Sequence, residues 1–223
     1  MDGNRRWAKK RLLPAALGHA SGAKRVRVLV ETCIRLKIPH LSIFAFSTEN
    51  WRRPEDEVSV LMGLFVSYLQ KEVDDMQANG VCLKVVGDKS KFSPELQELI
   101  AKAEQQTQHN TNITLRVAAN YGGRWDLVQA TKAWQRSHPN DSLDNLTEEA
   151  LTPYLSTADA PEMDLLIRTG GESRISNFML WQAAYAEMFF INTLWPDFTV
   201  KHFNEALEWF AKRDRRFGSA APF

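Results

Sequence analysis

Five short runs rich in β-branched and aromatic residues recur along the chain, and longer segments of helical period separate them. The runs are His40–Ser47, Val81–Asp88, Asn112–Asn120, Glu162–Thr169 and Ala186–Ile191. Their apolar character is continuous rather than alternating, which is typical of strands covered on both faces and hence of a parallel sheet. Because strands and helices alternate, the sequence predicts an α/β fold with a mostly parallel central sheet flanked by helices.

Helices are expected where apolar residues recur at helical spacing. They are Ser21–Ile38, Pro54–Ala78, one that begins at Ser93, Arg124–Arg136, Thr147–Leu155 and Val200–Lys212. The only stretch that resembles a linker, Ser137–Asn145, is too short to divide the chain, so we expect a single domain over 1–223. The pattern also calls for a strand leading into Asp2, and the sequence begins after the position where it would lie.

The composition is that of an ordinary globular protein, and the charges are nearly balanced. The 223 residues are 44% hydrophobic and 25% charged, with a formal net charge of +1. A general surface for nucleic acid is therefore not indicated, and any anion site must come from local clustering. Cys33 and Cys82 lie in separate apolar segments and are expected to be reduced. With no apolar run long enough for a membrane span and no leader pattern, a cytoplasmic location is expected.

Polar residues cluster where the expected strands end. The clusters are Phe46–Pro54, Asn120–Asp126 and Ile167–Asn177, and Met1–Arg6 is a fourth if a strand precedes it. Ligands of open parallel sheets bind beyond the carboxyl ends of the strands. The sequence therefore predicts a ligand site built from these loops.

Arginines dominate these loops and predict a site for anions. They are Arg5, Arg6, Arg53, Arg168 and Arg174. The guanidinium group matches phosphate oxygens, and five of them favour two anionic groups rather than one. Nearby glycines, namely Gly3, Gly170 and Gly171, would allow backbone N–H groups to approach such anions.

Few acids accompany the arginines: Asp2, Glu49, Glu172 and Glu187. Mg²⁺ typically takes one or two carboxylates together with phosphate oxygens and water, and Asp2 is the first candidate and Glu187 the second. Two simpler interpretations stay open. Asp2 beside arginines is also what a solvated ion pair looks like, and Glu187 within an apolar strand also fits a residue that faces solvent.

Other classes of site lack their motifs. The sequence has no phosphate-binding G-x-x-x-x-G-K-[ST] loop, no G-x-G-x-x-G, no G-x-S-x-G and no zinc spacing. The segment Pro54–Ala78 is strongly apolar in its middle, which fits either a core helix or the wall of a tunnel for a long apolar tail. Diphosphate groups joined to an apolar tail describe prenyl diphosphates.

Six motifs in order make the chain similar to the cis-prenyltransferases, and to those of the bacterial undecaprenyl diphosphate type most of all. They are "MDGNRRWAKK", "GHASGA", "FAFSTENWRRP", "AANYGGRWD", "IRTGGESRISNFMLWQ" and "LWPDF". The resemblance implies a hydrophobic tunnel, a homodimer, and Mg²⁺-dependent extension of farnesyl diphosphate by successive isopentenyl diphosphate units. The product would be undecaprenyl diphosphate, a lipid carrier precursor for the bacterial cell wall, and peripheral membrane contact would accompany its release.

The resemblance also implies roles for individual residues. Asp2 and Glu187 would hold the metal, and Gly3, Asn4, Arg5, Arg6 and His19 would bind the allylic diphosphate, with Trp7 and Trp51 packed at the site. Arg168, Arg174, Ile175 and Ser176 would hold isopentenyl diphosphate, and Ser47, Thr48, Glu49, Asn50 and Arg53 would line the space between the two. Arg216, Phe217 and Gly218 would reach a neighbouring subunit's site.

The chain departs from the family pattern at two positions. Ala15 and Ser173 stand where many relatives have arginine and some have histidine, which puts head-group and metal affinity in doubt. Asn50 is often assigned as the base of this family, but a neutral amide is a poor base, so we expect it to orient the substrate while a diphosphate oxygen accepts the proton. A short-chain synthase and a non-catalytic subunit of the same fold are the alternatives.

Overall fold

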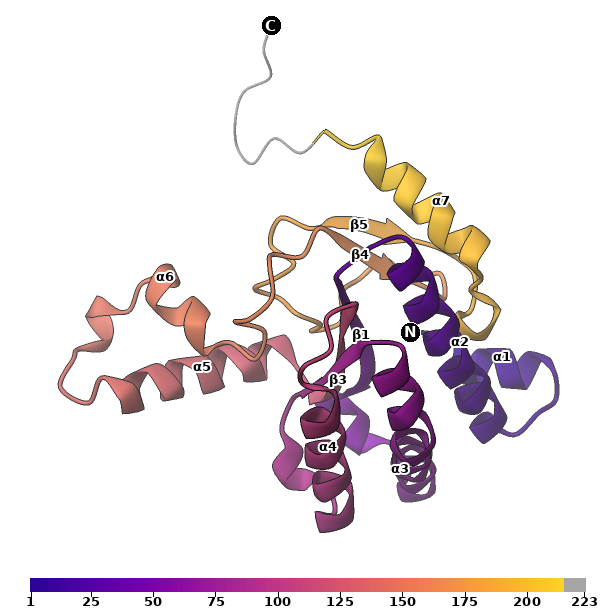
Figure 1. The fold of residues 1–223 in the computed structure, drawn as a ribbon, viewed down its shortest axis with the longest axis horizontal. Coiled ribbons are helices and arrows are strands. Elements are labelled where there is room, and N and C mark those ends of the chain that lie inside the picture. Colours follow the sequence, from indigo (N-terminus) through magenta and orange to yellow (C-terminus); the bar gives the residue numbers. More distant parts are fainter. Residues whose placement is uncertain (215–223) are drawn as a thin grey trace, which may run out of the picture. The chain divides into compact units, whose positions relative to one another are not determined.

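The computed structural model describes residues 1–214, in which five strands pair only in parallel. β1 (His40–Ser47), β3 (Ile113–Tyr121) and β2 (Val81–Val86) form one sheet in the order β1-β3-β2. β4 (Leu165–Arg168) and β5 (Glu187–Phe190) form a second, two-stranded sheet. The predicted α/β class with parallel strands and flanking helices is confirmed (Figure 1).

Two compact units divide the described residues. The first unit contains residues 1–25, 162–175 and those from Leu180 onward, and the second contains 26–161 and 176–179. The single domain expected from the sequence stays a prediction.

The core of the second unit lies around β3, whose residues are buried except Thr114. Figure 1 shows α3 (Glu55–Ala78) and α4 (Pro94–Thr107) side by side. α4 buries the face formed by Leu96, Ile100, Ala103 and Thr107, which recur at helical spacing. Ser93 accepts a hydrogen bond from the Leu96 N–H and caps the helix as predicted.

α3 is more apolar than its burial requires. Only Leu69 and Met76 of this helix are buried, and Val60 is 43% exposed. The remaining apolar side chains of its first half are at most partly covered. Both interpretations of this helix, a core element and a tunnel wall, stay open.

Further helices of the second unit are α5 (Gly123–Ser137) and α6 (Glu148–Leu151). In the first unit, α1 (Asn4–Lys10) is followed by the start of α2 (Ala15–Arg35), and α7 (Val200–Ala211) buries Phe203 and Ala206. α2 continues into the second unit, where Val26, Val30 and Cys33 are buried on one face. No helix among residues 1–214 is both long enough and apolar enough to cross a membrane.

Three helix predictions need correction. α1 occupies part of what was expected to be a loop, because its N-cap Gly3 supplies no side-chain cap that would signal a helix start. α2 begins at Ala15 rather than Ser21. The expected helix Thr147–Leu155 ends early: α6 stops at Leu151 and a 3₁₀ turn, Thr152–Tyr154, follows with Pro153 in it.

Candidate active site

Asp2 is fixed through its backbone at the carboxyl end of β4. Its N–H donates to Thr169 Oγ1 at 3.0 Å, and the Thr169 hydroxyl donates back to the Asp2 carbonyl oxygen at 3.0 Å. The same carbonyl accepts the N–H of Trp195 at 2.9 Å. Thr169 is 2% exposed, so this arrangement is shielded from water and places the Asp2 carboxylate at the strand end.

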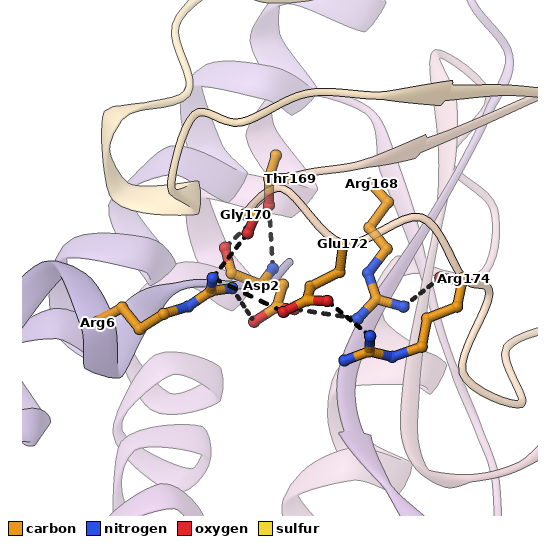
Figure 2. Close-up of polar contacts among 7 residues, drawn as sticks. All are labelled: Asp2, Arg6, Arg168, Thr169, Gly170, Glu172 and Arg174. Atoms are coloured by element: carbon orange, nitrogen blue, oxygen red, sulfur yellow. Dashed lines mark hydrogen bonds and ion pairs between the residues drawn. The ribbon is translucent and has the colours of Figure 1, made fainter.

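Two arginines contact the Asp2 carboxylate from different elements (Figure 2). Arg168 Nη2, from the last residue of β4, lies 3.1 Å from Oδ2, and Arg6 Nη2, from α1, lies 3.3 Å from Oδ1. Arg6 Nη1 also donates to the Gly170 carbonyl oxygen at 2.7 Å. Sequence segments that lie more than 160 residues apart therefore meet at one acid.

Glu172 and Arg174 extend this cluster. Arg174 Nη1 lies 2.6 Å from Glu172 Oε2, and Arg6 Nη1 lies 3.9 Å from Glu172 Oε1. Arg168 donates to the Arg174 carbonyl oxygen. We call Asp2, Arg6, Arg168, Glu172 and Arg174 the arginine cluster. Its three guanidinium groups and two carboxylates leave one net positive charge, which suits an anionic ligand.

The arginines keep the Asp2 side chain ionised. Partial burial raises the pKa of Asp2, but hydrogen bonds and charges from Arg168 and Arg6 outweigh burial, so the pKa lies below its ordinary value. The carboxylate is half-exposed and the Arg168 side chain is largely covered. At neutral pH the cluster thus presents an ionised carboxylate and three permanent cations.

Gly170 and Gly171 do not offer their N–H groups to an anion, contrary to the sequence-based expectation. Gly170 donates to the Thr193 carbonyl at 2.8 Å and Gly171 donates to the Ile191 carbonyl at 3.0 Å. Both have positive φ, 91° and 77°. A Cβ on Gly170 would lie 2.6 Å from Arg6 Nη2, so this glycine makes room for the arginine instead.

Two glycines of α2 let α1 approach closely. A Cβ on Gly18 would lie 2.2 Å from the Asn4 carbonyl oxygen, and one on Gly22 would lie 2.4 Å from Asn4 Oδ1. The Gly22 carbonyl accepts the buried Trp195 indole N–H at 2.8 Å. Gly3 has φ 106° and packs directly against Leu194, which leaves no room for a Cβ. These contacts hold the start of α1, and with it Arg6, in place.

Trp7 has a structural partner in the same unit. Its indole N–H donates to Asp197 Oδ1 at 2.7 Å, and the Arg11 guanidinium stacks 4.3 Å from the Trp7 ring centroid. Arg11 also pairs with Asp197 at 3.2 Å. Trp7 is therefore held by a cation and an acid, and its predicted packing against substrate stays a prediction.

In the second unit, the residues after β1 form a 3₁₀ turn, Thr48–Arg52. Asn50 Oδ1 accepts the Ser47 N–H at 3.1 Å, which caps this turn. Trp51 donates its indole N–H to Asn120 Oδ1 at 2.7 Å, and Asn120 is 1% exposed. Asn50 Oδ1 thus accepts one backbone hydrogen bond, and the amide NH₂ group of Asn50 is a donor that a ligand can use.

Glu49 is tied to a residue far along the chain. Asn177 Nδ2 donates to Glu49 Oε1 at 2.8 Å, and Asn177 Oδ1 accepts the Arg124 N–H at 2.9 Å. Burial raises the pKa of Glu49, but the bond from Asn177 and further local hydrogen bonds lower it overall. Arg53 pairs with Glu57 at 3.1 Å.

Glu187 is not brought beside Asp2 by the first unit's sheet. It starts β5 opposite Leu165, whereas Arg168 ends β4 opposite Phe190. Three residues of strand separate these positions, roughly 10 Å. The Glu187 carboxylate accepts from Arg213 Nε at 3.2 Å. Among residues 1–214, no three His, Cys, Asp or Glu side chains gather as a metal site.

The other predicted site residues are spread over both units. Arg5 is exposed on α1, His19 is half-buried on α2, Ile175 is half-buried and Ser176 is exposed with φ 50°. Arg216, Phe217 and Gly218 lie outside the described residues.

Sequence reasoning missed four residues that position the site. They are Thr169, Asn120, Asn177 and Asp197. Three of them lie inside the polar clusters at strand ends. The sequence therefore predicts where these three residues lie, but it does not predict their hydrogen-bond partners. Asp197 lies in "LWPDF", whose tryptophan and aspartate show no pattern that identifies a distant partner.

The fold and the arginine cluster define a parallel α/β protein with clustered arginines and carboxylates at a strand end. A family model described as "Putative undecaprenyl diphosphate synthase" (Prenyltransf) matches residues 1–218. The chain belongs to this family and is a prenyltransferase.

Named relatives agree along nearly the whole chain. An isoprenyl transferase of Neisseria meningitidis serogroup A is 51% identical over 98% of this chain and 86% of its own length. A ditrans,polycis-undecaprenyl-diphosphate synthase ((2E,6E)-farnesyl-diphosphate specific) of Pseudomonas aeruginosa is 50% identical over 99% and 89%.

Solved structures share the fold. A lavandulyl diphosphate synthase of Lavandula x intermedia, in complex with dimethylallyl diphosphate, has a TM-score of 0.92 at 34% identity, covering 98% of this chain and 95% of its own. A probable undecaprenyl diphosphate synthase of Campylobacter jejuni has a TM-score of 0.80 at 36% identity, covering 90% and 93%.

Proposed function

We propose that the protein extends farnesyl diphosphate with successive isopentenyl diphosphate units, with Mg²⁺, to make undecaprenyl diphosphate. The observation that carries this proposal is the arginine cluster around Asp2, in a chain about half identical to named undecaprenyl-diphosphate synthases. The cluster holds ionised acid and guanidinium groups at one strand end, which is the chemistry that a diphosphate requires.

The guanidinium groups stabilise the charge that develops on the leaving diphosphate. As the allylic C–O bond breaks, negative charge builds up on the diphosphate oxygens, and fixed cations are worth most at that moment. Arg6, which is proposed to bind the allylic diphosphate, is held by the Gly170 carbonyl, and Arg168, which is proposed to bind isopentenyl diphosphate, is held by the Arg174 carbonyl. Their present bonds to Asp2 would be exchanged for bonds to the ligand.

Asp2 fits one carboxylate ligand of Mg²⁺, because it is ionised, half-exposed and fixed through its backbone. When bound there, Mg²⁺ would supply Lewis-acid charge to the diphosphate. Glu187, the second acid expected to bind the metal, begins β5 opposite Leu165, so it does not share the Asp2 position and would need a separate route to the metal.

The remaining chemistry is formation of a carbon–carbon bond and loss of a proton. The isopentenyl double bond attacks the allylic carbon, a C–C bond forms, and a proton leaves the new chain. A neutral amide is a poor base, so Asn50 orients substrate through its NH₂ donor while a diphosphate oxygen takes the proton. The partly covered apolar face of α3 would line a tunnel for the growing tail.

A homodimer and a cytoplasmic location, with peripheral membrane contact during product release, belong to the same proposal. These three properties are inferred from membership of the family and not from the contacts of the arginine cluster.

The test is incubation of the purified protein with farnesyl diphosphate, radiolabelled isopentenyl diphosphate and Mg²⁺, followed by thin-layer separation of the dephosphorylated products. An undecaprenol-length product is expected. A shorter product would assign a short-chain synthase. No incorporation would refute the proposal in favour of a non-catalytic subunit.

A further inference from the structure

The turn between α1 and α2, together with the first turn of α2, exposes three leucines within six residues. Leu12 is 95% exposed, Leu13 38% and Leu17 48%. They lie in the segment Lys9–Leu17, "KKRLLPAAL", which we call the leucine turn and which is the indigo loop after α1 in Figure 1. Large apolar side chains gathered on a surface in this way mark contact with a partner or a membrane.

Leu12 is held outward by a strained helix end. α1 finishes in a Schellman motif: the Leu13 N–H donates to the Ala8 carbonyl at 2.9 Å, and the Leu12 N–H donates to the Lys9 carbonyl at 3.2 Å. Leu12 therefore has φ 55°, a left-handed conformation in which glycine is preferred. A leucine that is both strained and almost fully exposed is unfavourable for the isolated fold, which points to a role outside it.

Cations dominate the sequence around the leucine turn. Residues 3–30 contain eight Lys and Arg and no Asp or Glu, although the whole chain has a net charge of only +1. Lys9 and Lys10 are exposed, and within residues 1–214 neither pairs with a carboxylate. Arg11 shares its charge with Asp197. The leucine turn thus combines exposed apolar groups with two lysine charges that are not neutralised.

We propose that the leucine turn docks on an anionic lipid surface. Leucines enter the boundary between headgroups and acyl chains, while adjacent lysines meet anionic headgroups. A nucleic acid would use the cations and leave the leucines exposed, and an apolar protein groove would not need the lysines. The inference rests on exposure and charge at this turn, and it stands or falls independently of the proposed reaction.

The experiment is co-flotation of the full chain with vesicles of phosphatidylcholine and phosphatidylglycerol, compared with phosphatidylcholine alone. Binding to the mixed vesicles is expected, and it weakens as salt is raised. Leu12→Gly is the central variant, because glycine relieves the left-handed strain and the fold should be at least as stable. It is expected to reduce partition about tenfold, equivalent to about 1.4 kcal/mol.

Matched controls separate this surface from general effects. Leu143, 54% exposed in the second unit, provides Leu143→Ser, which should leave partition unchanged. Lys9→Gln with Lys10→Gln should weaken binding to the mixed vesicles, whereas Lys71→Gln with Lys102→Gln, also at exposed positions, should not.

Three outcomes would overturn the proposal. The wild-type chain does not float with the mixed vesicles; or the leucine and lysine variants bind them as well as wild type; or light scattering shows that Leu12→Gly lowers the oligomer mass, which assigns the turn to a second copy of the chain. Isopentenyl incorporation in detergent without vesicles tests the reaction separately, so failure of either proposal is recognised.

Discussion

The close approach of α1 to α2 makes Gly18→Ala a sharp test of how the arginine cluster is held. A Cβ at this position would lie 2.2 Å from the Asn4 carbonyl oxygen and 2.9 Å from its carbonyl carbon. Both are backbone atoms, so no side-chain rotation relieves the contact. α1 would have to retreat by roughly 1 Å to reach van der Waals separation.

The expected energy is a balance of two terms. Overpacking of this kind costs about 1–3 kcal/mol, whereas replacing glycine by alanine within a helix gains up to about 1 kcal/mol. We expect a net loss of about 1–2 kcal/mol in the free energy of unfolding. Because Arg6 lies on the helix that moves, a displacement of about 1 Å should also lower kcat/KM by up to about 10²-fold.

Gly63→Ala is the matched control, since Gly63 lies in α3 and a Cβ there meets nothing within 4 Å. It should stabilise the protein by about 0.8–1 kcal/mol. Urea unfolding followed by circular dichroism measures both variants, and isopentenyl incorporation measures the activity of Gly18→Ala. If both substitutions stabilise equally and Gly18→Ala keeps full activity, the contact does not position the cluster.

Three further predictions concern single groups. Asp2→Ala should lower turnover by about 10²-fold or more with an unchanged circular dichroism spectrum, because it removes the acid that Arg6 and Arg168 face; near-normal isopentenyl incorporation would disprove the role. Arg168→Ala should raise the KM for isopentenyl diphosphate about 10- to 100-fold, as expected for a lost charged hydrogen bond, and an unchanged KM removes it from that site. His40 has its pKa lowered by burial and by Arg116, so its contribution to stability is present above about pH 6.5 and is lost as pH falls through the lower folded pKa. In urea titrations, His40→Gln should flatten the decline in unfolding free energy between neutral and mildly acidic pH, and an unchanged decline contradicts the assignment.

β2 and β3 were predictable because burial on both faces leaves an unbroken apolar run, whereas β1, β4 and β5 are only partly buried and were recognised by their β-branched and aromatic residues. β3 was expected at Asn112–Asn120 and lies at Ile113–Tyr121, and β1 lies where it was expected. α1 was not predictable, because its stability comes from tertiary contacts. Gly3 beneath Leu194 and Asn4 against Gly18 hold a seven-residue helix whose own sequence has no capping signal.

The arginine cluster was predictable in composition but not in its hydrogen bonds. Arg6, Arg168 and Arg174 meet as expected, since loops at parallel strand ends converge. The N–H groups of Gly170 and Gly171 were assigned to an anion, yet they bond to the chain that follows β5. A glycine in the sequence indicates that a positive φ is possible at that position. The acceptor of its N–H group, however, depends on where the segment after β5 lies, and the sequence does not show this.

Strand direction decides which acids can share a ligand. Arg168 ends β4 and faces Asp2, whereas Glu187 begins β5, and in a parallel pair the beginning of one strand lies far from the end of its neighbour. The Asp2 oxygens therefore face Arg6 and Arg168 rather than a second carboxylate. A divalent cation at Asp2 would meet this positive charge unless an anion arrives with it.

We therefore expect Mg²⁺ and diphosphate to bind cooperatively at Asp2. Inorganic pyrophosphate would draw Arg6 and Arg168 away from the Asp2 carboxylate and would supply the oxygens that Mg²⁺ prefers. Isothermal titration should show at least tenfold tighter Mg²⁺ binding when the protein is saturated with pyrophosphate, after correction for the affinity of the two ions in solution. Asp2→Asn should abolish that gain while pyrophosphate still binds the arginines. Equal Mg²⁺ affinity with and without pyrophosphate would mean that the metal has a carboxylate set elsewhere, and that Asp2 serves the arginines alone.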